Sequence, residues 1–257
     1  LGLLLAAGGF DPTVIVGTKL REFGGSNFRA GKSQYLVIEA DEWNRSFYHH
    51  HPRVAVVTNV DREHLDTYKS FAGVKKGFLK FLKNVVGEGV IVVNHGDPGT
   101  RRVIAKNANW LRNNANNIIW YNRGRFHAHP LLIPGAHNQA NAEAAWQTAK
   151  YLGIKKSAAD RVFRSYHGSW RRLERIRPTH YSLLSTLYSD YAHHPTEIKA
   201  TLAALREQYP KKRIVAVFQP HLADRLNSLF KEFTRAFGDA DKLIVLPVYK
   251  VAGRHTE

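Results

Sequence analysis

The segment SDYAHHPTE (residues 189–197) places an acidic residue and two adjacent histidines directly before a proline. An apolar run ends at Asp190, and Pro195 stands where the first turn of a helix tolerates proline. The free N–H groups at a helix start attract an anion, and His193 and His194 would lie beside it. The segment therefore predicts a helix N-terminus that faces an anionic group.

The segment FQPHLADR (218–225) repeats this design after the apolar run RIVAV, with His221 and Arg225 near a strand end. In an open parallel sheet, ligands bind beyond the carboxyl ends of the strands, where loops and helix N-termini converge. Two neighbouring strand ends that each carry basic groups favour one shared pocket for an anion.

Three carboxylates follow the apolar run YLVI in the segment EADE (39–42). Glu39, Asp41 and Glu42 would stand at a strand end, where their oxygens suit Mg²⁺. This ion keeps most of its waters and binds one or two protein carboxylates. The same residues could equally form a cluster that caps a helix.

One histidine stands among acidic residues in VDREHLDTY (60–68), after the apolar run VAVVTN. His64 could bind a metal ion or carry a proton, because the carboxylates of Asp61 and Asp66 are close to it in sequence. An ordinary loop histidine is the alternative for His64 taken by itself.

A Pro-Gly turn in IPGAHNQANAEAA (133–145) leads into an alanine-rich helical pattern. His137, Asn138 and Asn141 stand at its start, and amide side chains offer the paired donors and acceptors that adenine requires. Asparagine also simply caps helices, so both interpretations stay open here.

Two arginines, Arg171 and Arg172, stand in HGSWRRLE (167–174), where the apolar patterning of the chain breaks. A guanidinium at such a junction could clamp a transferring phosphoryl group when two domains close. A surface ion pair is the alternative.

Short β-rich runs that alternate with helical patterns are expected to position these residues. Strands that are buried on both faces and separated by helices are typical of a parallel α/β sheet. The runs are YLVIEA (35–40), RVAVVTN (53–59), GVIVVN (89–94), NIIWYN (117–122), RIVAVFQ (213–219) and KLIVLPV (242–248).

Three apolar stripes with a helical period should each cover one face of a sheet. They are Phe71-Val74-Phe78-Leu82, Ile198-Leu202-Leu205-Tyr209 and Leu229-Phe230-Phe233-Phe237. The break near residue 175 predicts two domains, 1–174 and 175–257.

Composition sets further limits on the class of protein. The chain has no cysteine, which excludes disulfides and thiolate chemistry and fits a reducing compartment. Its 38 Lys and Arg against 21 Asp and Glu give a net charge of +17, which attracts phosphates of any kind. No apolar run is long enough to span a bilayer. Because it contains no methionine and begins inside a helix-like run, we expect a fragment that is open at both ends.

Six segments in this order, EADE, TNVDREHLDTY, IPGAHNQANAEAA, RRLE, DYAHHPTE and FQPH, strongly resemble the motifs of the Mur ligases of peptidoglycan synthesis. The resemblance runs from about residue 8 to about residue 253. It implies a mostly parallel-sheet central ATPase domain, truncated at its N-terminus, followed by part of a Rossmann-like C-terminal domain. The chain is most similar to the member that joins L-alanine to UDP-N-acetylmuramate in the cytoplasm.

The resemblance implies ATP-dependent amide formation through an acyl phosphate, with ATP and Mg²⁺ as cofactors. It implies Mg²⁺ ligands at Glu39 and His64, a nucleotide segment at His137, Asn138 and Asn141, and a phosphate contact and catalytic role at Arg172. His64, Asp190, His193 and His194 are also implied as catalytic. His221 and Arg225 would lie near substrate carboxylates. The family's phosphate loop would precede Leu1, so the chain by itself is expected not to turn over ATP.

The chain departs from the family at Ser189, where an aspartate is usual, and at Asp224 and Leu226, where serine and threonine are usual. A homologue that keeps the fold without the reaction is therefore one alternative. A related ligase that attaches a tripeptide to UDP-N-acetylmuramate is another. A basic α/β protein that binds nucleic acid is the third, and it leaves the motif order unexplained.

Overall fold

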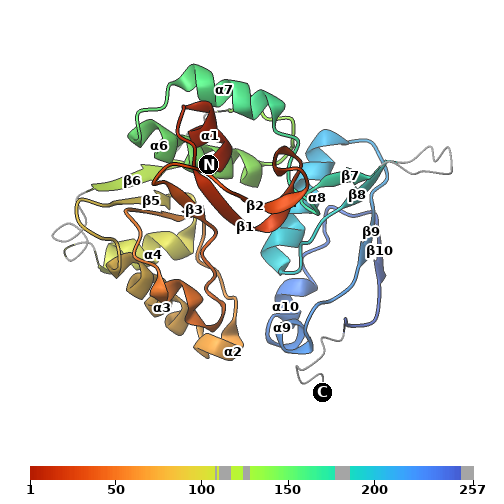
Figure 1. Ribbon diagram of the computed structural model, residues 1–257. Helices are drawn as coiled ribbons and strands as arrows, with labels where there is room; N and C mark the ends of the chain where they lie inside the picture. Colours follow the sequence, from red (N-terminus) through yellow and green to blue (C-terminus); the bar gives the residue numbers. More distant parts are fainter. Residues whose placement is uncertain (108, 110–116, 124–127, 177–185, 250–257) are drawn as a thin grey trace.

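The computed structural model describes residues 1–107, 109, 117–123, 128–176 and 186–249 (Figure 1). The chain opens with helix α1 and a small three-stranded sheet of order β2-β1-β3, in which β1 pairs antiparallel with β2 and parallel with β3. These elements are α1 (Gly2–Ala7), β1 (Thr13–Leu20), β2 (Ser26–Arg29) and β3 (Leu36–Ile38). The 3-10 helices η1 (Arg21–Phe23) and η2 (Trp43–His49) follow β1 and β3.

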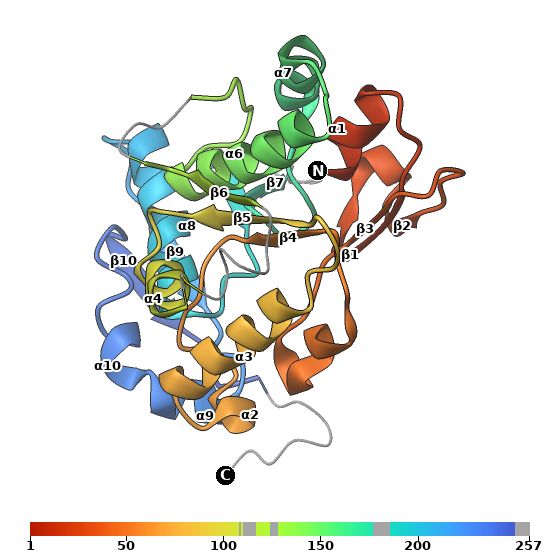
Figure 2. The same cartoon turned by 90° about the vertical axis from the view of Figure 1, so that its left-hand side faces the viewer.

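A second sheet of order β4-β5-β6 is wholly parallel. Its strands are β4 (Val54–Val57), β5 (Val90–Asn94) and β6 (Asn117–Tyr121). The helices that accompany it are α2 (Leu65–Tyr68), α3 (Phe71–Lys83), α4 (Pro98–Lys106), α6 (Ala136–Tyr151) and α7 (Lys156–Ser165). Helices α3 and α4 lie on one face of this sheet and α6 on the other (Figure 2).

Alternation along the strands explains these layers. In β5, Ile91 and Val93 point into the cluster with α3 and α4, while Val90 and Val92 point into the cluster with α6. Because β5 is central, both of its faces are covered and its sequence is an unbroken apolar run. Helices α1, α6 and α7 then pack together in a further cluster around Leu5. We call residues 1–165 the first lobe.

Residues 174–249 form what we call the second lobe, on the right of Figure 1. It holds an antiparallel pair of short strands, a parallel pair and three helices. These are β7 (Glu174–Ile176), β8 (Leu187–Ser189), α8 (Pro195–Gln208), β9 (Val215–Phe218), α9 (Ala223–Ser228), α10 (Phe230–Phe233) and β10 (Lys242–Val245). Helix α8 packs on β9 through Ile198, Leu202 and Phe218.

The expected α/β class with mostly parallel sheets is confirmed, and all six predicted strands exist. The stripe from Leu229 to Phe237 is wrong as one helix, because α9 ends before Leu229 and α10 ends at Phe233. Phe230 is 59% exposed, whereas Leu229 and Phe233 are buried in the core and Phe237 packs against it. The domain division at residues 174 and 175 stays a prediction.

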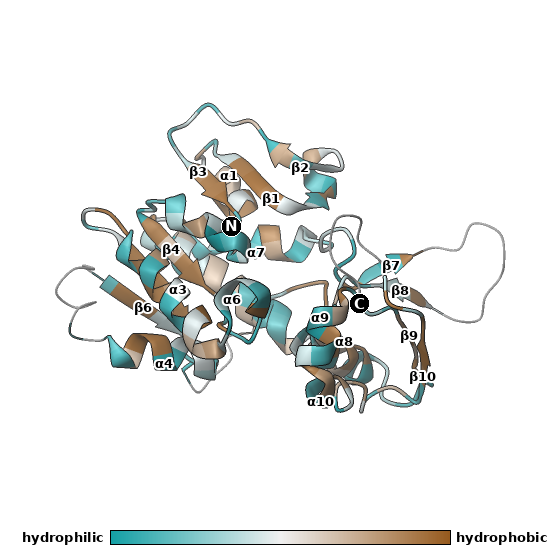
Figure 3. Ribbon diagram, turned by 90° about the horizontal axis from the view of Figure 1, so that it is seen from below, coloured by the Kyte–Doolittle hydropathy of each residue, from teal (hydrophilic) through white to brown (hydrophobic). Residues whose placement is uncertain are grey.

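Strand β9 is hydrophobic along its length, and so is β10 after its first residue, Lys242 (Figure 3). Phe218 is buried against α8, while Val217 and Val245 are exposed. Within the described residues, no helix combines the length and the apolar character that crossing a bilayer requires.

Candidate active site between the two lobes

One group of three possible metal ligands exists among the described residues: Asp41, Glu42 and His64. One ligand atom from each lies within 4.8 Å of the others, and His64 Nε2 is 3.6 Å from Glu42 Oε1. Glu42 precedes η2, and the hydroxyl of Tyr68 donates to its backbone carbonyl. His64 precedes α2 with a left-handed φ of 51°. Two loops that follow different strands thus bring carboxylate oxygens and an imidazole together.

Burial raises the pKa of Glu42 above its ordinary value, and the neighbouring His64 acts in the opposite direction. A divalent cation would offset this cost of burying a carboxylate. Carboxylate oxygens are the ligands that Mg²⁺ prefers, so the chemistry of the donor set fits that ion.

Glu39, the other predicted ligand, directly follows β3, and its side chain is bonded to the neighbouring strand β1. Its Oε2 accepts a hydrogen bond of 2.6 Å from the backbone N–H of Gly17 in β1. The structure groups His64 with Asp41 and Glu42 and does not include Glu39 in that group. Ligation by Glu39 therefore stays a prediction.

The predicted nucleotide segment forms the first turn of α6. His137 and Asn138 stand there, Asn141 follows in the second turn, and the side-chain amide of Asn138 donates to the carbonyl of Pro134 at 2.7 Å. Gly135 has a φ of 104°, and a Cβ there would lie 2.8 Å from the Cβ of Ala204. Only glycine allows this turn to approach α8 so closely.

Burial lowers the pKa of His137, Asp190 acts to raise it and Arg172 acts to lower it. The charges of Asp190 and Arg172 therefore act on His137, although α6 belongs to the first lobe and Asp190 to the second. The sequence places His137 at a helix start, Arg172 at the junction of two domains and Asp190 at a strand end, and helices α6 and α8 are in contact in the structure.

The start of α8 is a capping box built by His194 and Glu197. The Nδ1 atom of His194 accepts from the N–H of Thr196 at 3.2 Å, so the ring proton is on Nε2. That Nε2–H donates to the carbonyl of Arg62 in the first lobe at 3.3 Å. Glu197 Oε2 accepts from the N–H groups of His193 and His194. Sequence reasoning did not single out Glu197, although a glutamate three residues after a capping residue signals this box.

The imidazole of His193 has a defined orientation. Its Nδ1 lies 2.9 Å from the carbonyl of Tyr191, which can only accept, so Nδ1 carries the proton and Nε2 is the basic atom. Burial lowers the pKa of His193, and the carboxylate of Glu197 acts in the opposite direction. The ring also lies edge to face with that of His221, 6.1 Å between centroids. His193 thus directs Nδ1 to the carbonyl of Tyr191 and lies beside His221, a predicted substrate-binding residue.

Asp190 braces the backbone that crosses between the lobes. Its two oxygens accept from the N–H groups of Leu173 and Ala192, each at 2.7 Å. Leu173 has a left-handed φ of 48°, a strained conformation for a branched side chain. Directly before Leu173, the side chain of Arg172 is 48% exposed and its Nη1 lies 3.5 Å from Glu197 Oε1. The guanidinium of Arg172 is held loosely and remains accessible.

The loop between β4 and α2 makes three further contacts with the second lobe. Asp61 Oδ2 accepts from the hydroxyl of Thr196 at 2.6 Å. Arg62 pairs with Glu232 at 2.6 Å, and Glu63 with Arg225 at 2.8 Å. Helix α2 also contacts α9. The two lobes are therefore joined by polar contacts in this structure.

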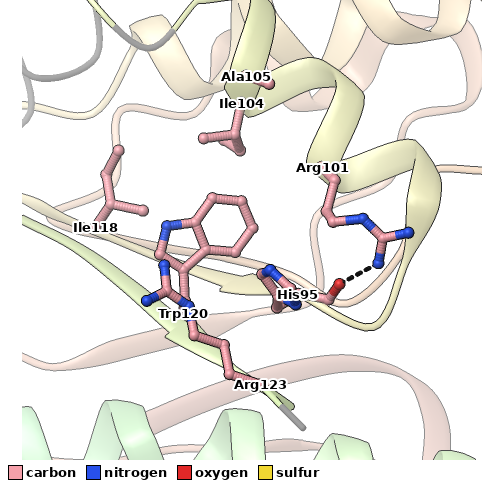
Figure 4. A pocket seen from close by; sticks show the side chains of 7 residues that line it. All are labelled: His95, Arg101, Ile104, Ala105, Ile118, Trp120 and Arg123. Atoms are coloured by element: carbon pink, nitrogen blue, oxygen red, sulfur yellow. Dashed lines mark hydrogen bonds between the residues drawn. The ribbon is translucent and has the colours of Figure 1, made fainter.

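Two cavities are notable in the described part of the chain. One of about 330 Å³ lies between the lobes and is lined by Glu63, His64, Leu222 and Arg225, among others. The other, of about 460 Å³, lies between α4 and β6, where His95, Arg101 and Arg123 surround Trp120 (Figure 4). The cavity between the lobes adjoins both the possible metal ligands and the basic groups, so it is the stronger candidate for the reaction site.

The whole chain is similar to known ligases. The Mur ligase middle domain matches residues 26–149, and the glutamate ligase domain of Mur ligases matches residues 171–256. The UDP-N-acetylmuramate--L-alanine ligase of Desulfosudis oleivorans is 37% identical over 98% of the chain and 58% of its own length. That of Aquifex aeolicus is 38% identical over 96% of the chain and 58% of its own length. The chain thus spans a little over half the length of these relatives.

Solved structures support the same fold. The UDP-N-acetylmuramate-alanine ligase from Thermotoga maritima has a TM-score of 0.73 at 22% identity, over 96% of this chain and 58% of its own. The murein peptide ligase from Psychrobacter arcticus has a TM-score of 0.60 at 19% identity, over 96% and 65%. Two Mur ligase domains match the chain in order, and its relatives align along nearly its whole length. The chain therefore belongs to the Mur ligase family.

Proposed function

We propose that this chain supplies the nucleotide and amino-acid sites of a ligase that uses ATP to join L-alanine to UDP-N-acetylmuramate in the cytoplasm. The observation that carries the proposal is 37% identity to such a ligase along 98% of the chain. The cavity between the lobes supports it, because its lining includes His64, one of the three possible metal ligands, and the basic side chains of Arg62 and Arg225.

The chemistry explains why both lobes are needed. A carboxylate is a poor electrophile, because its oxygen leaves badly. Its oxygen therefore attacks the terminal phosphorus of ATP, ADP leaves, and the acyl phosphate formed has phosphate as its leaving group. The amine of alanine then attacks the carbonyl carbon, phosphate departs and a proton leaves the nitrogen. Each step crowds negative charge that the protein must neutralise.

His64, Asp41 and Glu42 would hold Mg²⁺, and Glu39 is the further predicted ligand. The ion would neutralise phosphate charge when bound. The first turn of α6, with His137, would hold the nucleotide.

Arg172 would face the transferring phosphoryl group, because its guanidinium is accessible and only loosely held by Glu197. Asp190 would support it by fixing the backbone of the adjacent Leu173, and His194 would do so by capping α8, the helix that carries Glu197. The direct catalytic roles that the resemblance to the Mur ligases implies for Asp190 and His194 stay a prediction.

His193 would accept the proton from the attacking amine. Its Nδ1 is bonded to a carbonyl, which leaves Nε2 for an incoming proton, and burial lowers the pKa of the ring, which favours the form that can accept one. His221 lies against it, and Arg225 would bind the carboxylate of the amino acid.

Phosphate release tests this function in a full-length protein that contains this chain and is as long as its relatives. We expect release from ATP and Mg²⁺ only when UDP-N-acetylmuramate and L-alanine are both present. Release that ignores the amino acid would contradict the assignment. Turnover with a tripeptide but not with alanine would identify the recycling ligase, and salt-sensitive DNA binding without turnover would favour a polyanion-binding protein.

A further inference from the structure

Arg62 and Glu63 are consecutive residues, and each forms an ion pair with the second lobe. The two pairs differ in burial. In the pair with Glu232, the side chains of Arg62 and Glu232 are 45% and 42% exposed. In the other pair, those of Arg225 and Glu63 are 8% and 19% exposed. Exposed pairs contribute little to docking, whereas a buried guanidinium that loses its partner is strongly disfavoured.

The guanidinium of Arg225 is fixed from two sides. Its Nε donates to Glu63 Oε1 at 2.8 Å, and its Nη2 lies 2.8 Å from the same oxygen. Its Nη1 donates to the carbonyl of His221 at 3.1 Å. A guanidinium has five N–H donors, so these contacts leave one on Nη1 and one on Nη2 for an incoming carboxylate.

The same oxygen of Glu63 also bonds to the backbone of His64, one of the three possible metal ligands. Glu63 Oε1 accepts from the backbone N–H of His64 at 3.2 Å, next to the left-handed φ of that residue. One carboxylate oxygen therefore joins the guanidinium of Arg225 in the second lobe to the backbone of His64 in the first. The cavity of about 330 Å³ is lined by all three of these residues.

We propose that Glu63 is a positioning residue for the amino-acid substrate: it sets the guanidinium of Arg225 at a fixed place relative to His64. A substrate carboxylate bound to Arg225 would then be held beside the activated acyl group. The proposal rests on the proposed function, because it takes the substrate of Arg225 to be an amino acid. The roles that the resemblance implies for the motif residues include none for Glu63.

Three variants of the full-length protein test this role: Glu63→Ala, Glu63→Gln and the matched control Glu232→Gln. We expect Glu63→Ala to raise the KM for L-alanine about 10- to 100-fold, the usual effect of losing a group that orients another, while kcat changes much less. Glu63→Gln keeps an oxygen acceptor and should restore most of the affinity. Glu232→Gln removes the other ion pair between the lobes and should leave the KM unchanged.

Two outcomes would overturn the proposal. An equal rise in KM for Glu63→Ala and Glu232→Gln would mean that both only dock the lobes. A fall in KM for Glu63→Ala would mean that Glu63 competes with the substrate carboxylate for Arg225.

A second measurement needs no turnover. The Nε–Hε signal of Arg225, identified by its loss in Arg225→Lys, should be protected from solvent exchange in the full-length wild-type protein and in Glu232→Gln but not in Glu63→Ala. Exchange that is unchanged in Glu63→Ala would overturn the positioning role. A protected signal in a wild-type protein that shows no alanine-dependent turnover would contradict the proposed function. It would also contradict the amino acid as the substrate of Arg225.

Discussion

Replacement of His64 by alanine is expected to lower kcat for alanine-dependent phosphate release by about 10²- to 10³-fold, the range for removing one contributor to charge stabilisation. The imidazole is 3.6 Å from Glu42 and belongs to the group that would hold Mg²⁺. Without it, the two carboxylates would bind the ion in a poorer position against the phosphates. Initial rates at saturating ATP and Mg²⁺ measure the effect.

His95→Ala is the matched control for that variant. His95 lines the other cavity, between α4 and β6 (Figure 4). Its loss should leave kcat within about threefold of the wild-type value, as expected for a residue away from the reaction. A His64→Ala enzyme with the activity of His95→Ala would show that His64 is not a metal ligand.

Replacement of Arg172 by alanine should lower kcat by a similar factor, about 10²- to 10³-fold, because a charge that neutralises the transferring phosphoryl group is lost. Arg172→Lys should recover only part of the rate, since an ammonium cannot reproduce the planar fork of a guanidinium. The KM for ATP should change less than kcat, because the contact matters most when charge develops in the transition state.

The preceding residue provides the control. The guanidinium of Arg171 lies over the ring of Trp170, 4.5 Å from its centroid, so it points to a different neighbour. Arg171→Ala should retain most of the activity. Equal losses for both arginines would mean that the whole crossing segment is disturbed and that Arg172 has no special contact.

The sequence revealed those strands that are buried on both faces, because such strands are continuous apolar runs. Strand β5 is the clearest case, with four buried valines and isoleucines in a row. Strand β1 was missed, since Gly17 and Lys19 interrupt its apolar pattern and its residues, apart from the buried Val14, alternate between partly buried and exposed. Strands β7 and β8 have three residues each, too few for a period to emerge.

The candidate site divides in the same way. Residues at strand ends could be named from the sequence, because the carboxyl edge of a parallel sheet gathers them. The sequence did not reveal which carboxylate of EADE approaches His64, because the backbone turns into η2 directly after Glu42. The pairing of Glu63 with Arg225 spans 162 residues and depends on how the two lobes dock, which no local pattern encodes.

The central claim is that side chains from both lobes surround one nucleotide and its metal ion. The direct measurement is a crystal structure of the full-length protein with a non-hydrolysable ATP analogue and Mn²⁺, located by its anomalous scattering. We expect the ion at about 2.0–2.3 Å from His64 Nε2, a normal coordination distance, with the terminal phosphate facing Arg172 and the base at the start of α6. A nucleotide bound outside the cavity between the lobes, or an ion without His64 as a ligand, would contradict the claim.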